Sequence, residues 1–380
     1  MINLVSNLFS FLFIFSIFND NFVVELFNSL SLKIIFVLFV LFNLPKIISS
    51  FKYFSNIHKI FYSLIFVIFL VTMINTIQEE YFLDFLLNST ILLIAIIIIF
   101  TFYSQADLGK TLNFIWISIS ISVIICYFNE PISEWTFRTT GGTGDPNEFA
   151  TQLLIYIFLS IYLYKTYKNL IYLVIGLPFF TYGILMASSK SSFLVLGVLL
   201  ILLSFSKIKN ILNYKTIILI LILIFAINSI DFSKFELILN AISRFETNNT
   251  ASHRLDSWIA GYNLIENNFL TGIGMDEYAN TIMKYSSIYL DPGSRAPHNV
   301  YLALIAENGI FVLVLFLFFL FTIFRENFFY LFRSEYIFIQ FMYLSLFLMA
   351  FTLGIQYDKY TWLIIAIYSN ILFSIKKEKL

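Results

Sequence analysis

The chain has 380 residues and a net charge of zero, and its composition excludes an ordinary soluble domain. Hydrophobic residues make up 59% of the sequence and charged residues only 12%, whereas soluble domains carry about a quarter charged residues. The apolar residues come in long runs, such as 92–102, 217–227 and 311–324, which need a non-aqueous environment. The single cysteine, Cys126, lies in an apolar run, so an internal disulfide and a cysteine-based metal site are excluded.

The apolar segments predict an all-α, polytopic integral membrane protein with about 12 transmembrane helices in one membrane domain, 1–380. The N-terminal segment lacks the basic residues and the cleavage site of a signal peptide, so we expect a retained helix. The predicted segments are 4–18, 29–44, 60–77, 82–103, 111–128, 149–164, 171–187, 192–206, 216–230, 298–324, 336–353 and 361–375.

The distribution of basic residues predicts the orientation of the chain. With the N-terminus inside, most of the 23 Lys and Arg residues fall in cytoplasmic loops, as the positive-inside rule requires. Both termini are then cytoplasmic, and the polar segments 129–148, 187–192 and 231–297 face outward. The segment 231–297 is expected to be a folded external loop between transmembrane helices and part of the active site. The chemistry of the protein is therefore expected on the external face.

The second half of this loop is predicted to contain short amphipathic helices. After Ser252, a suitable N-cap, five apolar residues recur at the spacing of one helical face, which predicts a helix lying on the membrane or packed on the bundle. These residues are Leu255, Trp258, Ile259, Tyr262 and Ile265. Gly272 and Gly274 are expected to end this helix, and 275–287 predicts a second, shorter one.

One of only three histidines, His298, lies where this loop meets the predicted helix 298–324. A helix of that length rises about 40 Å, and the hydrocarbon core is about 30 Å thick. Glu307 then falls near the outer lipid boundary and His298 roughly two and a half turns above it. There an imidazole can exchange protons near neutral pH. The alternative is a structural role, in which His298 only caps the helix after Pro297.

An ordered set of motifs resembles a known family. R-x-x-x-W at Arg254 and Trp258, G-I-G at 272–274, H-N-x-Y-L from His298 and E-x-G from Glu307 resemble the O-antigen ligase and O-antigen polymerase superfamily of membrane glycosyltransferases. The Gly-rich D-P-N element at 141–150 is similar as well, so the resemblance covers the chain from residue 138 to 309. It implies transfer of a glycan from a polyprenyl pyrophosphate, such as undecaprenyl pyrophosphate, to an acceptor hydroxyl.

The resemblance implies catalytic roles for three residues. Arg254 matches the family's arginine and is the expected pyrophosphate clamp, because a planar guanidinium binds phosphate through two hydrogen bonds. His298 matches the family's histidine and is expected to activate or position the acceptor hydroxyl. Glu307 is expected to contact sugar or to act as an acid–base partner, with a structural carboxylate as the alternative.

Further binding residues follow from the same comparison. Lys190 stands where relatives often carry arginine and is expected to contact the pyrophosphate. Arg138 is expected to be a second pyrophosphate contact, with an arginine that only snorkels or solvates the loop as an equal alternative. Asn299, Tyr301 and Trp258 are expected to bind substrate, although packing is an alternative for aromatic residues in so aromatic a chain. Asp145 is expected to make an Asx-type cap for a helix beginning near Glu148, a local structural role.

No metal and no cofactor are expected, because the family is thought to need neither and the sequence has no D-x-D pair. The expected partners are a polyprenyl pyrophosphate-linked oligosaccharide and membrane lipid, with a chain-length regulator and a flippase as further partners and no nucleic acid. The expected location is the bacterial inner membrane, with the active site facing the periplasm.

Three functions remain open at this point. The leading one is polymerisation of polysaccharide repeats in O-antigen or capsule biosynthesis, in which the growing glycan moves onto another lipid-linked repeat. The second is ligation of the completed polymer to lipid A–core in lipopolysaccharide biosynthesis. The third is transport, as a flippase of lipid-linked glycan. A transporter usually has ionisable groups at mid-membrane and two similar halves, and this sequence has neither.

Overall fold

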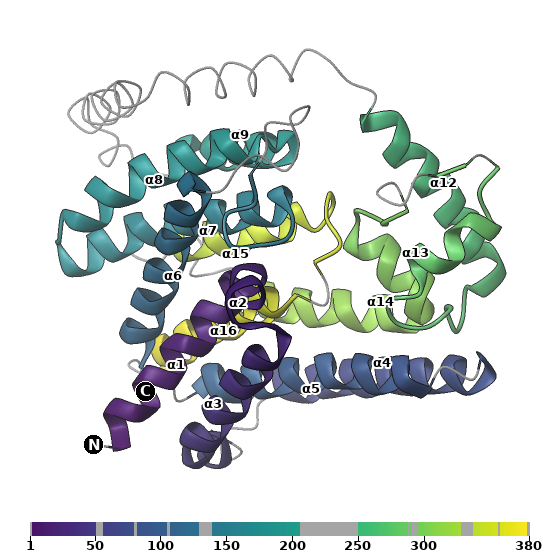
Figure 1. Cartoon of the computed structure of the whole chain (residues 1–380), viewed down its shortest axis with the longest axis horizontal. Coiled ribbons are helices and arrows are strands. Elements are labelled where there is room, and N and C mark those ends of the chain that lie inside the picture. Colours follow the sequence, from purple (N-terminus) through teal and green to yellow (C-terminus); the bar gives the residue numbers. More distant parts are fainter. Residues whose placement is uncertain are drawn as a thin grey trace. The chain divides into compact units, whose positions relative to one another are not determined.

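A computed structural model describes residues 2–50, 56–79, 82–104, 107–128, 139–205, 250–287, 289–290, 295–327, 337–355 and 358–377. In this part of the chain all regular secondary structure is helical, as predicted (Figure 1). The elements are α1 (Ile2–Phe18), α2 (Asp20–Phe27), α3 (Ser29–Ser50), α4 (Asn56–Glu79), α5 (Phe82–Ser104), α6 (Leu108–Phe128), α7 (Pro146–Tyr167), α8 (Ile171–Ala187), α9 (Lys190–Phe205), α12 (Thr250–Asn268), α13 (Tyr278–Thr281), the 3-10 helix η2 (Ile282–Lys284), α14 (Val300–Asn327), α15 (Ile337–Met349) and α16 (Lys359–Lys377).

Several of these helices have the length and composition of membrane spans. Among the described residues, four helices qualify, namely α3, α6, α7 and α14. The pair α1 and α2 is a fifth candidate if it counts as one span, although the two helices meet at 103°. A polytopic membrane protein is thus supported, while the predicted number of twelve spans stays a prediction. The predicted segment 216–230 lies outside the described residues.

Local sequence signals set several helix boundaries. The predicted segment 171–187 matches α8, and α7 begins at Pro146, behind Asp145. The Asp145 carboxylate accepts hydrogen bonds from the backbone N–H groups of Asn147 and Glu148 and so satisfies two of the unpaired donors of the first turn. The predicted Asx-type cap is confirmed, although the helix begins two residues before Glu148.

The contacts divide the chain into two compact units, each described by itself. Unit 1 comprises Met1–Lys46, Ala106–Thr247 and Tyr330–Met349, and unit 2 comprises Ile47–Gln105, Asn248–Phe329 and Ala350–Leu380. The expected single membrane domain stays a prediction.

In unit 1, α7 is the central helix. It packs against α6, α8, α9 and α15, and α1 packs against α6 (Figure 1). Small and polar residues let these helices of unit 1 approach one another closely. The indole Nε1 of Trp116 on α6 donates to the Ser160 hydroxyl on α7 at 2.9 Å. Within a membrane, lipid is as apolar as the side chains, so the hydrophobic effect does not drive helices together. Side-chain hydrogen bonds of this kind then help to hold them in contact.

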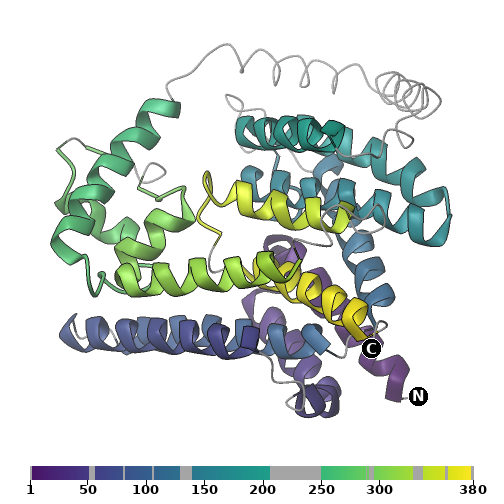
Figure 2. The ribbon, with the colours of Figure 1, turned by 180° about the vertical axis from the view of Figure 1, so that it is seen from behind.

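In unit 2, α14 packs along α4, and α16 packs along α5. The Phe61 ring joins three of these helices, because its centroid lies 5.6 Å from that of Phe319 and 5.4 Å from that of Trp362. The segment from α12 to η2 gathers beside the N-terminal part of α14, as the green ribbon in Figure 2 shows. Unit 2 therefore carries most of the family motifs.

Candidate functional site

The helix α12 packs on its neighbours through small residues. Ser257, Ala260, Gly261 and Leu264 are buried, whereas Leu255, Ile259 and Tyr262 are exposed. Of the two predicted alternatives, packing of this apolar face on the bundle is contradicted for Leu255, Ile259 and Tyr262, and its position on a membrane stays a prediction. The helix also begins at Thr250, so Ser252 lies inside it and is not the N-cap. Small residues let the backbone of α12 approach closely: a Cβ on Gly261 would overlap with the Tyr278 hydroxyl.

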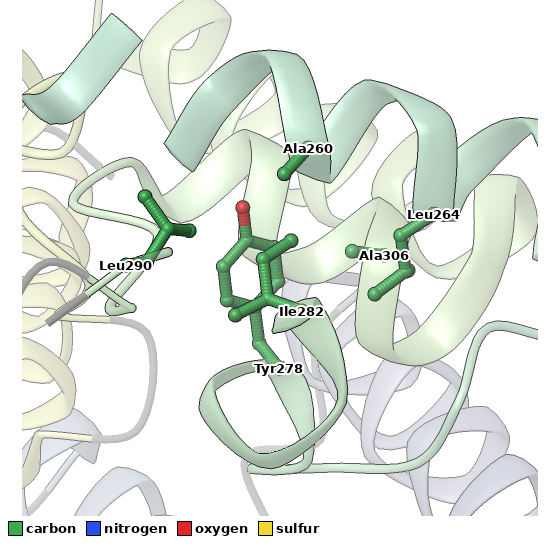
Figure 3. Packing of buried hydrophobic residues seen from close by; sticks show 6 residues of the cluster. All are labelled: Ala260, Leu264, Tyr278, Ile282, Leu290 and Ala306. Carbon is green, nitrogen blue, oxygen red and sulfur yellow. The ribbon is translucent and has the colours of Figure 1, made fainter. Parts of the chain in front are cut away.

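A small hydrophobic core fixes this segment to α14. Figure 3 shows the Tyr278 ring from α13 beside Ile282 and Leu290, with its hydroxyl directed towards α12. That hydroxyl donates to the Ser257 carbonyl oxygen at 2.8 Å. Burial raises the pKa of Tyr278 to about 12, so it stays a neutral donor at physiological pH. The prediction that short helices form in this segment is confirmed for residues 250–287, while its external position stays a prediction.

The helix α14 is interrupted at Gly309, where φ is 79° and ψ is 174°, a region that is essentially restricted to glycine. Beyond the break, the Ile310 N–H donates to the Phe269 carbonyl oxygen at 3.0 Å instead of continuing the helical ladder. The Ala306 carbonyl accepts from the Ile273 N–H at 3.1 Å, and the Glu307 carbonyl accepts from the Gly274 N–H at 2.8 Å. The G-I-G turn therefore supplies the hydrogen-bond partners that the broken helix lacks.

Glycine is required on both sides of this contact. A Cβ on Gly272, whose φ is 66°, would overlap with the Glu307 carbonyl, and a Cβ on Gly309 would overlap with the Leu270 carbonyl oxygen. We call this contact between 269–274 and 306–310 the interlock. It gives the G-I-G and E-x-G motifs a shared structural role, which sequence spacing alone does not reveal.

The R-x-x-x-W and H-N motifs also meet in unit 2. The Trp258 Nε1–H donates to the Pro297 carbonyl oxygen at 2.9 Å, and the Ser257 hydroxyl donates to the Ala296 carbonyl oxygen at 3.2 Å. Arg254 lies one helical turn before Trp258 and is half-buried. Two hydrogen bonds thus hold the helix that carries Arg254 against the residues immediately before His298.

His298 lies before α14 and not inside it. The prediction of a helix beginning at His298 is wrong, because α14 begins at Val300 and Asn299 caps it. The Asn299 Oδ1 accepts from the N–H groups of Tyr301 and Leu302 at 2.9 and 3.1 Å. The alternative in which His298 is the cap is therefore wrong as well. His298 has φ of 44°, a left-handed conformation that costs a non-glycine residue about 1–3 kcal/mol and is concentrated at functional sites.

The start of α14 is held firmly. The Val300 N–H donates to the Ala350 carbonyl oxygen at 2.8 Å, and the Tyr301 ring lies 4.7 Å from the ring of Phe351. The substrate-binding roles expected for Asn299, Tyr301 and Trp258 stay predictions, and each of these residues has a structural contact. Glu307 is 3% exposed, and its charge contributes to the raised pKa of Tyr278, so it lies within electrostatic range of that hydroxyl.

Unit 1 brings the other predicted elements together. The Thr139 N–H, at the start of the Gly-rich segment, donates to the Met186 carbonyl at 3.2 Å, just before the short turn between α8 and α9. Lys190 is exposed and is the first residue of α9. The unpaired N–H groups of a helix N-terminus favour anions, and a lysine there adds a positive charge. Arg138 lies outside the described residues.

The corner between α1 and α2 supports the Gly-rich segment. Asn19 is fully buried there, its Nδ2 donates to the Ser118 carbonyl at 3.1 Å, and its Oδ1 accepts from the Ser122 hydroxyl at 2.6 Å. The Phe22 N–H donates to the Gly142 carbonyl at 3.3 Å, and a Cβ on Gly142 would overlap with the Asn19 side chain. No family motif lies in this region, and an asparagine between two apolar runs is the only signal that the sequence of 4–28 offers.

The comparisons agree with the motifs. The model of the family described as O-antigen ligase (Wzy_C) matches residues 171–317. It confirms the resemblance to the O-antigen ligase and polymerase superfamily. The matched range contains Lys190, Arg254, His298 and Glu307, whereas Arg138 and the Gly-rich D-P-N element precede it. No curated protein matches the chain.

Proposed function

Because residues 171–317 match the O-antigen ligase family, whose members act on lipid-linked oligosaccharides, we propose that this chain is a polysaccharide polymerase of the bacterial inner membrane. It transfers glycan from a polyprenyl pyrophosphate carrier to a sugar hydroxyl of another lipid-linked repeat on the external face. Ligation to lipid A–core is the alternative from the same family, and the match supports it at least as well.

The observation that carries this proposal is the pair of hydrogen bonds from Trp258 and Ser257 to Pro297 and Ala296. They bring the arginine helix and the histidine segment to one place in unit 2. In the proposed reaction the bond between the anomeric carbon and the pyrophosphate oxygen breaks, and the acceptor oxygen bonds to that carbon. His298 takes the acceptor's proton, and the polyprenyl pyrophosphate leaves with its negative charge held by Arg254.

The remaining residues support the leaving group and the acceptor. Lys190, at the N-terminus of α9, offers a second positive charge for the pyrophosphate, and we assign Arg138 the same role. A side-chain ammonium lacks the two-pronged geometry of a guanidinium, so Lys190 is expected to contribute less than Arg254. We place Glu307 near the acceptor as a buried carboxylate, and Trp258, Asn299 and Tyr301 along the sugar path. The reaction is proposed to need no metal.

The test uses full-length protein in proteoliposomes with a defined polyprenyl pyrophosphate oligosaccharide, and products are read by mass spectrometry. Wild-type protein should extend the glycan by whole repeats, and Arg254→Lys and His298→Ala should lose turnover while remaining folded. Lys284→Ala removes an exposed basic residue of the same unit and should leave turnover unchanged. Normal turnover in both site variants would contradict this mechanism.

Two further outcomes separate the alternatives. A strain lacking the protein should make only single-repeat chains if it is a polymerase, whereas long polymer left on its lipid carrier identifies a ligase. Movement of lipid-linked glycan across the bilayer, undiminished in Arg254→Lys and His298→Ala, would instead identify a flippase.

A further inference from the structure

The turn after α12 carries two large apolar side chains that no described part of the chain covers. Phe269 is 47% exposed and Leu270 is 60% exposed. The segment 267–275 contains no charged residue, and the last charged residue before it, Glu266, lies about one helical turn from Leu270. We call residues 269–271 the tip. Its composition is that of a membrane-contacting segment and not of a water-facing turn.

The interlock fixes the depth of the tip along α14. The Phe269 carbonyl accepts from the Ile310 N–H, so the tip lies at the level of the Gly309 break. From Ile310 to the charged end of the span at Arg325, the helix rises about 22 Å. The hydrocarbon core is about 30 Å thick, so with Arg325 at the far boundary Ile310 lies about 8 Å below the near one.

The surface beside the tip is one that faces lipid. Beyond the break, the exposed side chains of α14 are large and apolar, beginning with Phe311 at 63% exposure and continuing through Val314, Phe318 and Phe321. This face belongs to a helix of mean hydropathy 2.5 that qualifies as a membrane span. The tip continues this apolar surface across the Phe269–Ile310 hydrogen bond. Tyr262, about two turns above the tip, suits the headgroup level, where aromatic side chains collect.

We propose that the tip enters the outer leaflet and that Phe269 and Leu270 contact lipid acyl chains. The loop that was predicted to face outward then has a re-entrant point beside α14. At this depth the Phe269 carbonyl is paired with the Ile310 N–H, and the N–H groups of Ile273 and Gly274 are paired with carbonyls of α14, which is the kind of pairing that a backbone in lipid requires. Acyl chains are the partner that fits, because the adjoining face of α14 already meets them.

The test places a fluorescent thiol label on full-length protein in phosphatidylcholine vesicles. The native Cys126 is fully buried, so wild-type protein serves as the unlabelled blank. Leu270→Cys reports on the tip, Phe318→Cys marks the lipid-facing side of α14, and Ala279→Cys marks an exposed site on α13. Phe269→Cys is a second reporter if Leu270→Cys does not fold. Quenching is measured with iodide in the water and with nitroxide on the lipid acyl chains.

The label at residue 270 should behave like that at 318, with quenching by nitroxide lipid and several-fold less quenching by iodide than at 279. Quenching by iodide as strong as at 279 would place the tip in water. Protection from both quenchers would mean that another protein or a second copy of the chain covers it. Either result overturns the proposal, and neither depends on whether the protein is a polymerase or a ligase.

Discussion

Replacing Gly309 by alanine tests the interlock directly. Alanine would have to adopt φ of 79° and ψ of 174°, which costs about 1–3 kcal/mol, and its Cβ would overlap with the Leu270 carbonyl oxygen. Relief of that overlap requires the segment 269–274 to move away from α14, which breaks the hydrogen bonds of the interlock to Ile310, Ala306 and Glu307. Each contributes about 1 kcal/mol, so together with the backbone strain the variant should lose about 4–6 kcal/mol of stability.

The assay is thermal unfolding of purified protein in detergent, followed by tryptophan fluorescence. The matched control is Gly197→Ala, which lies inside α9 with no neighbouring atom within 4 Å of the added Cβ. Alanine is favoured over glycine inside a helix by about 1 kcal/mol, so this control should unfold at the same or a slightly higher temperature. If Gly309→Ala unfolds at the wild-type temperature, the interlock does not stabilise the protein and the reasoning is wrong.

Four further predictions concern single contacts and conditions. Trp258→Phe keeps the ring but loses the donor to Pro297, so thermal unfolding should show a loss of about 1 kcal/mol and the proteoliposome assay a lower turnover. Asn19→Leu keeps the branched shape but removes the buried donor to the Ser118 carbonyl and the buried acceptor of the Ser122 hydroxyl, and should lose about 2 kcal/mol in the same unfolding assay. The raised pKa of Tyr278 makes the free energy of unfolding of the wild-type protein fall as pH rises from 10 to about 12, because in that range Tyr278 ionises only in the unfolded state. In Tyr278→Phe the free energy of unfolding, measured across the same pH range, should fall less steeply. Turnover should survive EDTA, and its loss, restored by added divalent metal, would contradict the metal-free mechanism.

Features set by neighbouring residues could be predicted from the sequence. The Asp145 cap needs only its own carboxylate and the next two N–H groups, so its role was predictable although the helix start was misplaced by two residues. To predict the start of α14, one had to decide whether His298 or Asn299 is its N-cap. Asparagine is a strong N-cap, and this preference decides the outcome. The predicted pattern of apolar and polar segments likewise matched the helices in the described part of the chain.

The sequence predicted an apolar face for α12 but left open whether that face packs on the bundle or lies on the membrane. A helix that packs closely does so through small residues, and its larger apolar residues are then left to lie against a membrane surface. Ser257, Ala260 and Gly261 therefore face the protein, while Leu255 and Ile259 face outward. The interlock could not be predicted at all, because it joins backbone groups that lie far apart in the sequence.

The interlock also has a consequence for how the loop and the span form. Without the N–H donors of Ile273 and Gly274, the carbonyls of Ala306 and Glu307 would enter the bilayer without hydrogen-bond partners, because lipid has no donors to offer them. During biogenesis α14 should reach its final depth only when the preceding loop has docked. A chimaera between relatives should therefore take the loop and this helix from the same parent, with the junction placed after Asn327.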